Sequence, residues 1–458
     1  MKIINQKTLF KSMGFCWVII LSIGLSSCEE FLEVKPDQSL VVPTTLEDVR
    51  ALLDNTNVFN VQSALPMISS EELWISDPGF NALSDPIEQA TYTWQEDPFL
   101  GGFGGDWVNH YQQVFYANVA LEVLNKYKGD QNEMYKTLLG SAYFLRGYAY
   151  SQLVFQFAKP FQKNGGNENI PGIVLKETAD INEPLRRSSL KKCYDRIIED
   201  LTLAEQLLPE RNTPKTRPNK AAALGALSRI YLASFEYAKA ADAAIKALSS
   251  YPDRLDFNKI NVNAARPFSR FDNETVFYSV LASLSFQRSA EVFVEGQLIA
   301  LYEKDDLRLP AFFDPAPNSR FNYMGKISGD TRNFGGISVG ELYLNAMEGL
   351  AKAGQNAQAL AFLNEFLSLR YSNKTFNPVS GLSSEALLAR ILEERRKELI
   401  GRGIRWMDLR RLNQEGNPVT LKRSVLGQTY ELLPNSLRYT YPIPQDEITR
   451  SGIEQNPR

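Results

Sequence analysis

The stretch NKAAALGALSRIYLASFEYAKAADAAIKALSSYPD, residues 219–253, decides the fold of this chain. Its apolar and small side chains recur three and four residues apart in two runs, which is the spacing of two amphipathic helices. Small residues at Ala240 and Ala247 let two such helices approach closely. A helix pair of this kind buries its apolar face by stacking on neighbouring pairs, so the stretch predicts a helical-repeat scaffold.

The spacing of this pair is that of the 34-residue tetratricopeptide repeat. A second unit follows in ELYLNAMEGLAKAGQNAQALAFLNEFLSLRY, residues 341–371, with Gly354 in its turn. The matching positions are Leu224, Leu227, Ser228, Tyr231, Ala240, Ala244, Ala247 and Pro252 in the first unit, and Tyr343, Ala346, Leu350, Ala359, Leu363 and Phe366 in the second.

A third unit is interrupted. Residues 141–157 match its first half and residues 190–208 its second half, and about thirty residues of loop composition separate the two halves. We therefore predict a mainly α-helical fold in which interrupted tetratricopeptide-type helix pairs form a scaffold over about 107–260 and 338–372.

Two long regions interrupt this scaffold, at about 57–106 and about 261–337. Both are rich in Asn, Asp, Pro, Gly and aromatic residues, and the second contains short β-like runs such as ETVFYSVLAS. Segments of this length are seldom mere connections, so we predict loop-rich, ligand-facing surfaces with a few short β-strands. Together with a C-terminal segment, 384–458, they complete one globular domain over 46–458.

The N-terminal sequence predicts export and lipidation. Residues 1–27 contain three lysines, an apolar stretch about half as long as a membrane span, and small residues before Cys28, as in a bacterial lipoprotein signal. We expect cleavage before Cys28 and acylation of its thiol and amine, which anchors a protein stably to a membrane. Residues 28–45 then form an extended tether, since Pro36 and Pro43 disfavour helix.

Composition excludes several functions. After cleavage 47 basic and 53 acidic side chains remain, a net charge of about −6, which offers no basic surface for nucleic acid. His110 is the only histidine, no cysteine cluster or Walker loop is present, and the glycine-rich run at 101–105 lacks the Lys-Ser/Thr pair of a phosphate loop. We therefore expect no metal site and no cofactor. Cys193 is expected in the core.

Carboxylates are the one remaining route to catalysis, because a glycosidase needs two of them a few ångströms apart across a cleft. Acidic residues in loops are usually solvated, so we expect no enzyme activity and no catalytic residue. The acidic residues in the first loop region are Glu71, Glu72, Asp77, Glu96, Asp97 and Asp106.

Clustered aromatic residues favour ligand binding instead. Three of the four Trp residues of the mature chain fall between residues 74 and 107. Sugar rings pack their C–H faces on aromatic rings, and their hydroxyls need polar partners. The predicted ligand-binding residues, chosen from composition and loop position, are Trp74, Asp77, Trp94, Trp107 and Asn109. A second candidate patch comprises Phe312, Phe313, Phe321 and Tyr323 with Arg308 and Arg320.

Several motifs point to one family. The most specific is ILEERRKELIGRGIRWMDLRR, residues 391–411, although Arg402 stands where an acid is expected. Cys28 to Glu33 with Pro36, the Arg146-Gly147-Tyr148 segment with Leu153, Phe157 and Pro160, and the tail YPIPQDEI with QNP match as well. This combination, which spans nearly the whole mature chain, resembles the SusD/RagB family of outer-membrane lipoproteins of Bacteroidota.

The resemblance implies a right-handed superhelical SusD-like scaffold on a lipoprotein that faces the cell exterior, with Glu29 and Glu30 as the signal for export to that face. It also implies an oligosaccharide or oligopeptide ligand and a SusC-like TonB-dependent barrel as partner, over which the protein acts as a lid. We expect the charges of residues 391–411 to pair with one another and hold the C-terminal helix to the scaffold.

Three other functions stay open. The repeats could form an interaction scaffold without a small ligand, the protein could be an oligopeptide-binding lid like RagB, or, least favoured, it could be a glycoside hydrolase. The identity of the cargo does not follow from the sequence.

Overall fold

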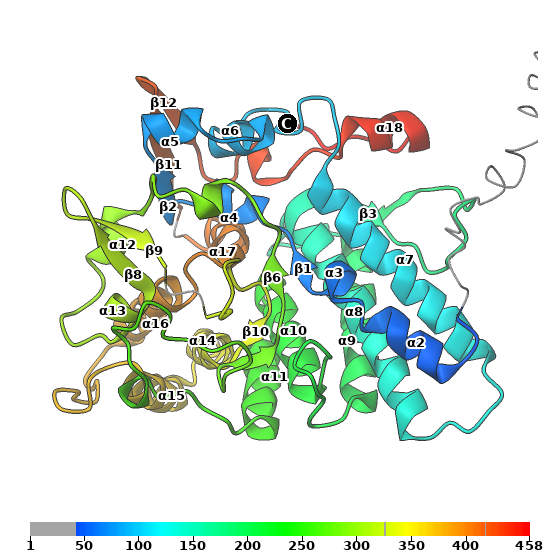
Figure 1. The fold of residues 1–458 in the computed structure, drawn as a ribbon, viewed down its shortest axis with the longest axis horizontal. Coiled ribbons are helices and arrows are strands. Elements are labelled where there is room, and N and C mark those ends of the chain that lie inside the picture. The colour runs from blue at the N-terminus through cyan, green and yellow to red at the C-terminus, as the bar shows by residue number, and fades with distance from the viewer. Residues whose placement is uncertain (1–42, 325–326, 417) are drawn as a thin grey trace, which may run out of the picture. The chain divides into compact units, whose positions relative to one another are not determined.

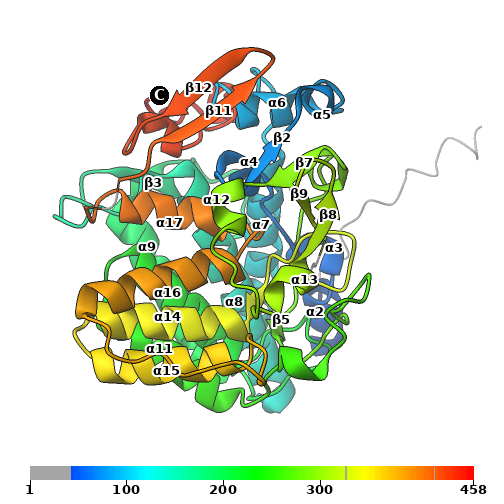
Figure 2. The same cartoon turned by 90° about the vertical axis from the view of Figure 1, so that its left-hand side faces the viewer.

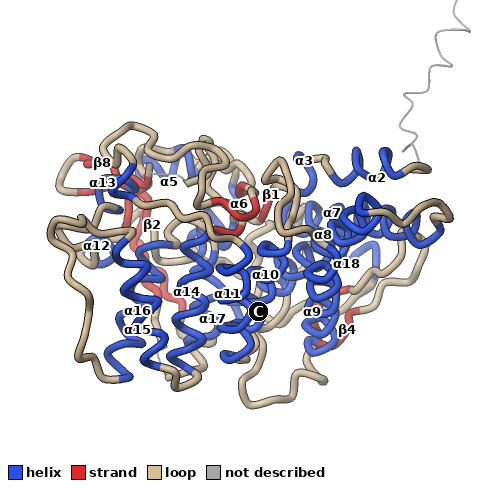
Figure 3. Tube along the Cα trace, turned by 90° about the horizontal axis from the view of Figure 1, so that it is seen from below, coloured by secondary structure: helices blue, strands red, loops and turns tan. Residues whose placement is uncertain are grey.

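The computed structural model describes residues 43–458 apart from 325–326 and 417. The signal peptide 1–27, Cys28 and all but the end of the tether lie outside the described residues. Helices dominate the described part, and the strands are short (Figure 3). A mainly α-helical fold with a few short strands is therefore confirmed.

The helices and strands have the following bounds. The helices are α2 (Leu46–Leu53), α3 (Thr56–Phe59), α4 (Leu65–Ser69), α5 (Asp77–Asn81), α6 (Pro86–Tyr92), α7 (Gly105–Lys126), α8 (Glu133–Phe157), α9 (Leu190–Leu207), α10 (Lys220–Ala233), α11 (Tyr237–Ser250), α12 (Gly296–Ile299), α13 (Arg308–Phe312), α14 (Val339–Lys352), α15 (Asn356–Ser368), α16 (Ser384–Glu398), α17 (Ile404–Leu412) and α18 (Gln445–Ser451). The strands are β1 (Val61–Gln62), β2 (Leu73–Ile75), β3 (Pro171–Val174), β4 (Arg187–Ser189), β5 (Thr275–Phe277), β6 (Val280–Leu281), β7 (Val292–Val294), β8 (Phe313–Ala316), β9 (Arg320–Tyr323), β10 (Ile337–Ser338), β11 (Leu421–Val425) and β12 (Gln428–Leu432).

The predicted repeat units fold as helix pairs. The first unit is α10 with α11, the second is α14 with α15, and the interrupted one is α8 with α9. Each helix from α7 to α11 packs on the next, and α14 continues the series by packing on α11 (Figure 1). Figure 2 shows α14 lying beside α11, α15 and α16, so α16, the first helix of the C-terminal segment, extends the scaffold.

Local sequence explains where these helices begin and end. The Asn219 side chain caps α10 by accepting a hydrogen bond from the backbone N–H of Ala222 at 2.9 Å. Gly354 adopts φ +78° between α14 and α15, a conformation that favours glycine. Ala240 and Ala247 of α11 are completely buried, as their small size predicts.

The two loop-rich regions are joined to each other. β1 pairs with β6 in parallel, and β2 pairs with β7 antiparallel, so strands of the first region lie beside strands of the second. The first region is also more helical than its composition predicts, because α3 to α6 lie within it. Ser76 and Asp85 cap α5 and α6, and a proline stands in the first turn of each, which allows such short helices in a Pro- and Asp-rich sequence.

Ion pairs hold the C-terminal segment to the scaffold, as predicted. Within the segment, Arg395 pairs with Asp408 at 2.7 Å and Lys397 with Glu394 at 3.0 Å. Outside the segment, Arg411 binds Glu348 of the scaffold helix α14, and Glu394 of α16 binds Arg308 of α13 in the second loop-rich region. These groups are almost completely buried, so each charge depends on its partner.

Candidate functional site

Two of the five predicted ligand-binding residues lie at one exposed corner, where β2 leads into α5. Trp74 is half-buried on β2 and packs on Phe293 of β7, with ring centroids 5.0 Å apart. The guanidinium of Arg320 lies 5.9 Å from the Trp74 centroid. Asp77 is exposed, and its carboxylate accepts a hydrogen bond from the Leu426 N–H of the β11–β12 turn at 2.8 Å.

Trp94 and Trp107 are packing residues, which corrects their assignment from the sequence. Trp94 is 4% exposed, and its indole N–H donates to the Ser69 carbonyl at 3.0 Å. Trp107 is 3% exposed and packs edge-on against Phe157. Neither ring has a face open to a ligand in this conformation, because Trp94 is hydrogen-bonded to α4 and Trp107 packs between α7 and α8.

Asn109 is exposed on α7, outside the corner that holds Trp74 and Asp77. The structure therefore does not bring the five predicted residues together. β-strand alternation explains part of this result: Leu73 and Ile75 point into the core, so Trp74 points to the opposite side.

The candidate carboxylates of the first loop-rich region have structural partners or face solvent. Glu71 pairs with Arg405, and Glu72 beside it is buried and accepts from the Gly401 N–H at 3.2 Å. Asp97 accepts backbone N–H groups of its own loop. Asp106 is buried and accepts from Gln156, and Glu96 is exposed. Each has a structural contact or faces solvent.

The remaining residues singled out in the sequence are also structural. His110 is buried, and its ring Nδ1 lies 2.6 Å from the Asp106 carbonyl oxygen. Cys193 is buried with a free thiol, and burial raises the pKa of that thiol to about 11. A thiol with so high a pKa stays protonated at neutral pH and is a poor nucleophile.

Glu72 makes stability depend on pH. Burial, and then the Glu71 carboxylate, raise the pKa of Glu72 to about 8, whereas an unfolded glutamate titrates near 4.3. The folded protein then keeps a proton that the unfolded chain loses, so stability falls as pH rises between these values, by about 1.4 kcal/mol per pH unit. Relative to Glu72→Gln, the wild type should lose about 2 kcal/mol of unfolding free energy between pH 6 and 7.5.

Urea unfolding at several pH values measures this difference. Glu72→Gln keeps an acceptor for the Gly401 N–H, so the two proteins should be similar at pH 5 and diverge above it. Parallel pH profiles would show that Glu72 is ionised in the folded state.

The largest cavity described, about 600 Å³, lies where the two loop-rich regions meet. Its walls come from α4, β2, the loop before β5, the segment leading into β7, the β8–β9 hairpin and the loop before β10. Its lining residues are Met67, Leu73, Ala265, Arg266, Pro267, Phe268, Gln287, Arg288, Ser289, Ala290, Val292, Asp314, Pro315, Asn322, Tyr323, Met324, Gly329, Asp330, Thr331 and Asn333.

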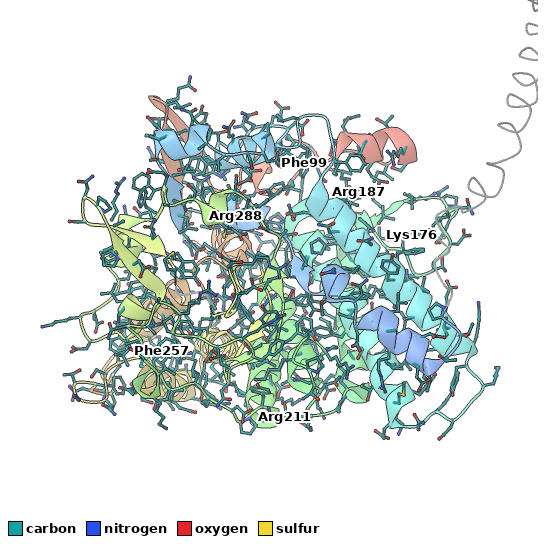
Figure 4. All side chains as sticks on the ribbon, in the orientation of Figure 1. Phe99, Lys176, Arg187, Arg211, Phe257 and Arg288 are labelled. Atoms are coloured by element: carbon teal, nitrogen blue, oxygen red, sulfur yellow. The ribbon has the colours of Figure 1, made fainter. Side chains whose placement is uncertain are left out.

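This cavity combines apolar and polar surface. Tyr323 contributes an aromatic ring from β9. Arg288, which comes from the short turn between β6 and β7 (Figure 4), Arg266 and Asp314 are exposed at its rim. The Asn322 side-chain amide donates a hydrogen bond to the Val292 carbonyl oxygen at 2.7 Å, and this bond fixes the position of the Asn322 side chain. The cavity therefore offers an aromatic wall with both hydrogen-bond donors and acceptors.

The second candidate patch of the sequence is divided by the structure. Tyr323 lines the cavity, whereas Phe312 and Phe313 are buried beneath it and Arg308 is enclosed in the ion-pair network. Phe321 and Arg320 are half-buried outside the cavity lining. Composition did not single out Arg266, Arg288 or Asn333, because these residues meet only after β2, β7 and β9 pack together.

Over residues 43–458, with their short gaps, no three His, Cys, Asp or Glu side chains are arranged to hold a metal ion. In the same described part, no helix has the length and apolar character that crossing a membrane requires.

Comparison with known families gives two matches that together cover most of the chain. Residues 30–232 match the family model described as SusD-like, starch-binding and associating with the outer membrane, and residues 322–458 match the model of the SusD family. A curated relative, SusD-like protein P2 of Formosa agariphila, is 22% identical over 413 residues, which covers 76% of this chain and 78% of that protein.

Solved structures show the same fold. A SusD superfamily protein of Bacteroides thetaiotaomicron is 21% identical with a TM-score of 0.73, covering 90% of this chain and 100% of the other. A protein of Bacteroides vulgatus described as a putative sugar binding protein is 21% identical with a TM-score of 0.74, covering 91% and 99%.

Proposed function

Because this chain belongs to the SusD family, we propose that it captures an oligomeric nutrient, most favourably an oligosaccharide, at the bacterial surface and delivers it to a SusC-like TonB-dependent barrel. In this proposal Cys28 carries the lipid that holds the protein on the outer face of the outer membrane. The protein performs no bond chemistry, and capture and release are its whole task.

The observation that carries this proposal is the 600 Å³ cavity between the two loop-rich regions. Its volume lies within the range of small-molecule sites, about 300–1,000 Å³. Sugars need an apolar surface for their C–H faces and both donors and acceptors for their hydroxyls. Tyr323 and Met324 supply apolar surface, and Arg288, Asp314 and Asn322 supply polar partners.

Trp74 and Asp77 remain proposed contacts at a second place. Trp74 lies on the opposite face of the β2–β7 pair from Leu73 and Val292, which line the cavity, and Asp77 follows it at the start of α5. An oligomer longer than the cavity can therefore extend to this corner, where Arg320 also lies. Asn109 is exposed on α7, which contributes no residue to the cavity lining, and we do not assign it to either place.

Delivery requires that the ligand favour one arrangement of the lid over another. A ligand shifts such an equilibrium only by its difference in affinity between the two states. If the barrel adds contacts to a ligand already in the cavity, the closed lid binds more tightly, and transport through the barrel then empties the cavity.

Removal of two rim charges should weaken binding. In Arg288→Ala/Asp314→Ala a ligand loses one charged donor and one charged acceptor at exposed positions, so we expect the Kd to rise about tenfold. Isothermal titration of the soluble protein lacking Cys28, first against plant, host and microbial oligosaccharides and then against a peptide digest, measures this change.

A matched control is Asp242→Ala/Lys246→Ala on α11, which also removes one acid and one base. This pair is 2.7 Å apart and exposed, away from the cavity. An unchanged Kd in the rim variant, with binding intact in the control, would remove the cavity from the proposal. Binding of the peptide digest alone would favour a RagB-like peptide lid. If no ligand binds but a barrel co-purifies with the protein, an interaction scaffold without a small ligand would be favoured.

A further inference from the structure

A second large cavity, of about 520 Å³, lies between the insertion after α8 and the C-terminal segment. It belongs to neither loop-rich region and shares no lining residue with the proposed sugar cavity. Its lining residues are Lys159, Pro160, Gln162, Lys163, Asn164, Ile170, Arg410, Asn413, Gln414, Asn435, Ser436, Leu437, Tyr439 and Thr440.

The charge of this lining is opposite in sign to that of the chain. Three cationic side chains and no acidic one line the cavity, although the whole sequence is acidic. Lys163 lies 3.3 Å from Glu415, but the same carboxylate also binds Lys352 at 2.7 Å. One negative charge is therefore shared by two positive charges. Among the described residues no carboxylate lies within ion-pair distance of Lys159.

The floor of the cavity contains buried donors without acceptors. Arg410 is 4% exposed, and its two terminal nitrogens donate to carbonyl groups at the end of α8, including those of Phe155 and Ala158. Within residues 43–458 as described, its Nε–H and the Tyr439 hydroxyl have no acceptor, and the Asn413 amide nitrogen has none besides the adjacent Tyr439 oxygen. Buried polar groups are nearly always satisfied, so a missing ligand or ordered water is the ordinary explanation.

The protonation states of these groups suit an anion. Burial raises the pKa of Tyr439 to about 12, which the adjacent Asn413 amide opposes, so the hydroxyl remains a donor at neutral pH. Burial lowers the pKa of Arg410 to about 10, which still leaves it protonated. The C-terminal end of α8 carries about half a negative charge. Arg410 donates to the carbonyls at that end, and its full positive charge is larger than this partial negative charge.

From this arrangement we infer that the cavity binds an oxyanion group, namely a sulfate, phosphate or carboxylate, either as a free ion or as a substituent of a glycan. The Arg410 Nε–H and the Tyr439 hydroxyl would hold its oxygens, and Lys159 and Lys163 would supply charge at the entrance. This site is independent of the proposed sugar cavity, and each can fail without the other.

The test compares Lys159→Gln/Lys163→Gln with the wild type. Both lysines are at least partly exposed, so the variant should fold normally, and a melting curve verifies this. Titrations at low ionic strength, where screening is weak, use inorganic sulfate, inorganic phosphate, and a sulfated oligosaccharide beside its desulfated form. We expect saturable binding by the wild type and at least a tenfold higher Kd in the variant.

Tyr439→Phe serves as a second variant, since it keeps the ring and removes one buried donor. We expect it to weaken the same ligand about threefold or more, and Lys191→Gln/Lys246→Gln, which removes two exposed lysines elsewhere, to leave its Kd unchanged. Preference for the sulfated oligosaccharide over free sulfate identifies a glycan substituent, and equal or stronger binding of the free ion identifies an inorganic anion. No saturable binding of any of these ligands, or equal Kd values in the cavity variants, would overturn the inference.

Discussion

Arg308→Ala is expected to lower the free energy of unfolding by about 4 kcal/mol, the largest effect of any single substitution considered for this protein. The Arg308 guanidinium is completely buried and binds Asp306 at 2.8 Å, Glu398 at 3.2 Å and Glu394. Its removal leaves three buried carboxylates to share the remaining cations. Removing one partner of a buried pair costs about 3–5 kcal/mol, because the other charge stays desolvated.

Urea unfolding of the variant measures this loss, and Arg211→Ala is the matched control. Arg211 (Figure 4) pairs with Asp253 at 2.9 Å and lies over the Tyr251 ring, but it is 46% exposed. Its removal should cost about 1 kcal/mol or less, since water replaces surface contacts. Equal costs for the two variants would mean that the buried network does not stabilise the fold.

The same network should weaken in acid. Burial opposes ionisation of Asp306, yet Arg308 and Lys397 hold its pKa at about 2, below the value near 3.9 of an unfolded aspartate. Its contribution to stability is therefore complete above about pH 4 and is lost as pH falls toward 2.

The sequence anticipated this network only in part. Residues 391–411 carry both acids and bases, and the pairs Arg395–Asp408 and Lys397–Glu394 agree with the expectation that these charges pair with one another. The partners Arg308, Glu348 and Asp306 come from helices and loops far away in the chain, and no spacing rule reveals them. Helix pairs were more predictable, because their periodicity is local and their stacking follows from their apolar faces.

The site was less predictable than the fold for a physical reason. Aromatic residues stabilise loops as readily as they bind sugars, so composition alone does not separate Trp94 and Trp107, which are buried, from Trp74, which is not. The Leu73-Trp74-Ile75 alternation does carry that information, since it turns Trp74 away from the core. The cavity itself depends on strand pairing between residues about 220 positions apart, as Leu73 with Val294.

Gly349→Leu is expected to destabilise the protein by about 3 kcal/mol, because α14 and α11 touch backbone to backbone at this position. A Cβ atom on Gly349 would lie 2.6 Å from the Tyr237 carbonyl oxygen and 2.8 Å from the Ala241 nitrogen, both atoms of the α11 backbone. Neither atom can turn aside as a flexible side chain would, so the two helices must separate. Leucine is a good helix former, and the loss cannot come from helix propensity.

Two control substitutions isolate this close contact in chemical unfolding. Ala357→Leu adds a side chain of similar volume to an exposed position of α15 and should change stability by less than about 0.5 kcal/mol. Gly354→Ala sits in open space at φ +78°, so it should cost only about 1 kcal/mol for backbone strain. Wild-type stability in Gly349→Leu would mean that the helix pairs are not packed as closely as tetratricopeptide units, whereas the expected order of costs, Gly349→Leu above Gly354→Ala above Ala357→Leu, ties the fold to that contact.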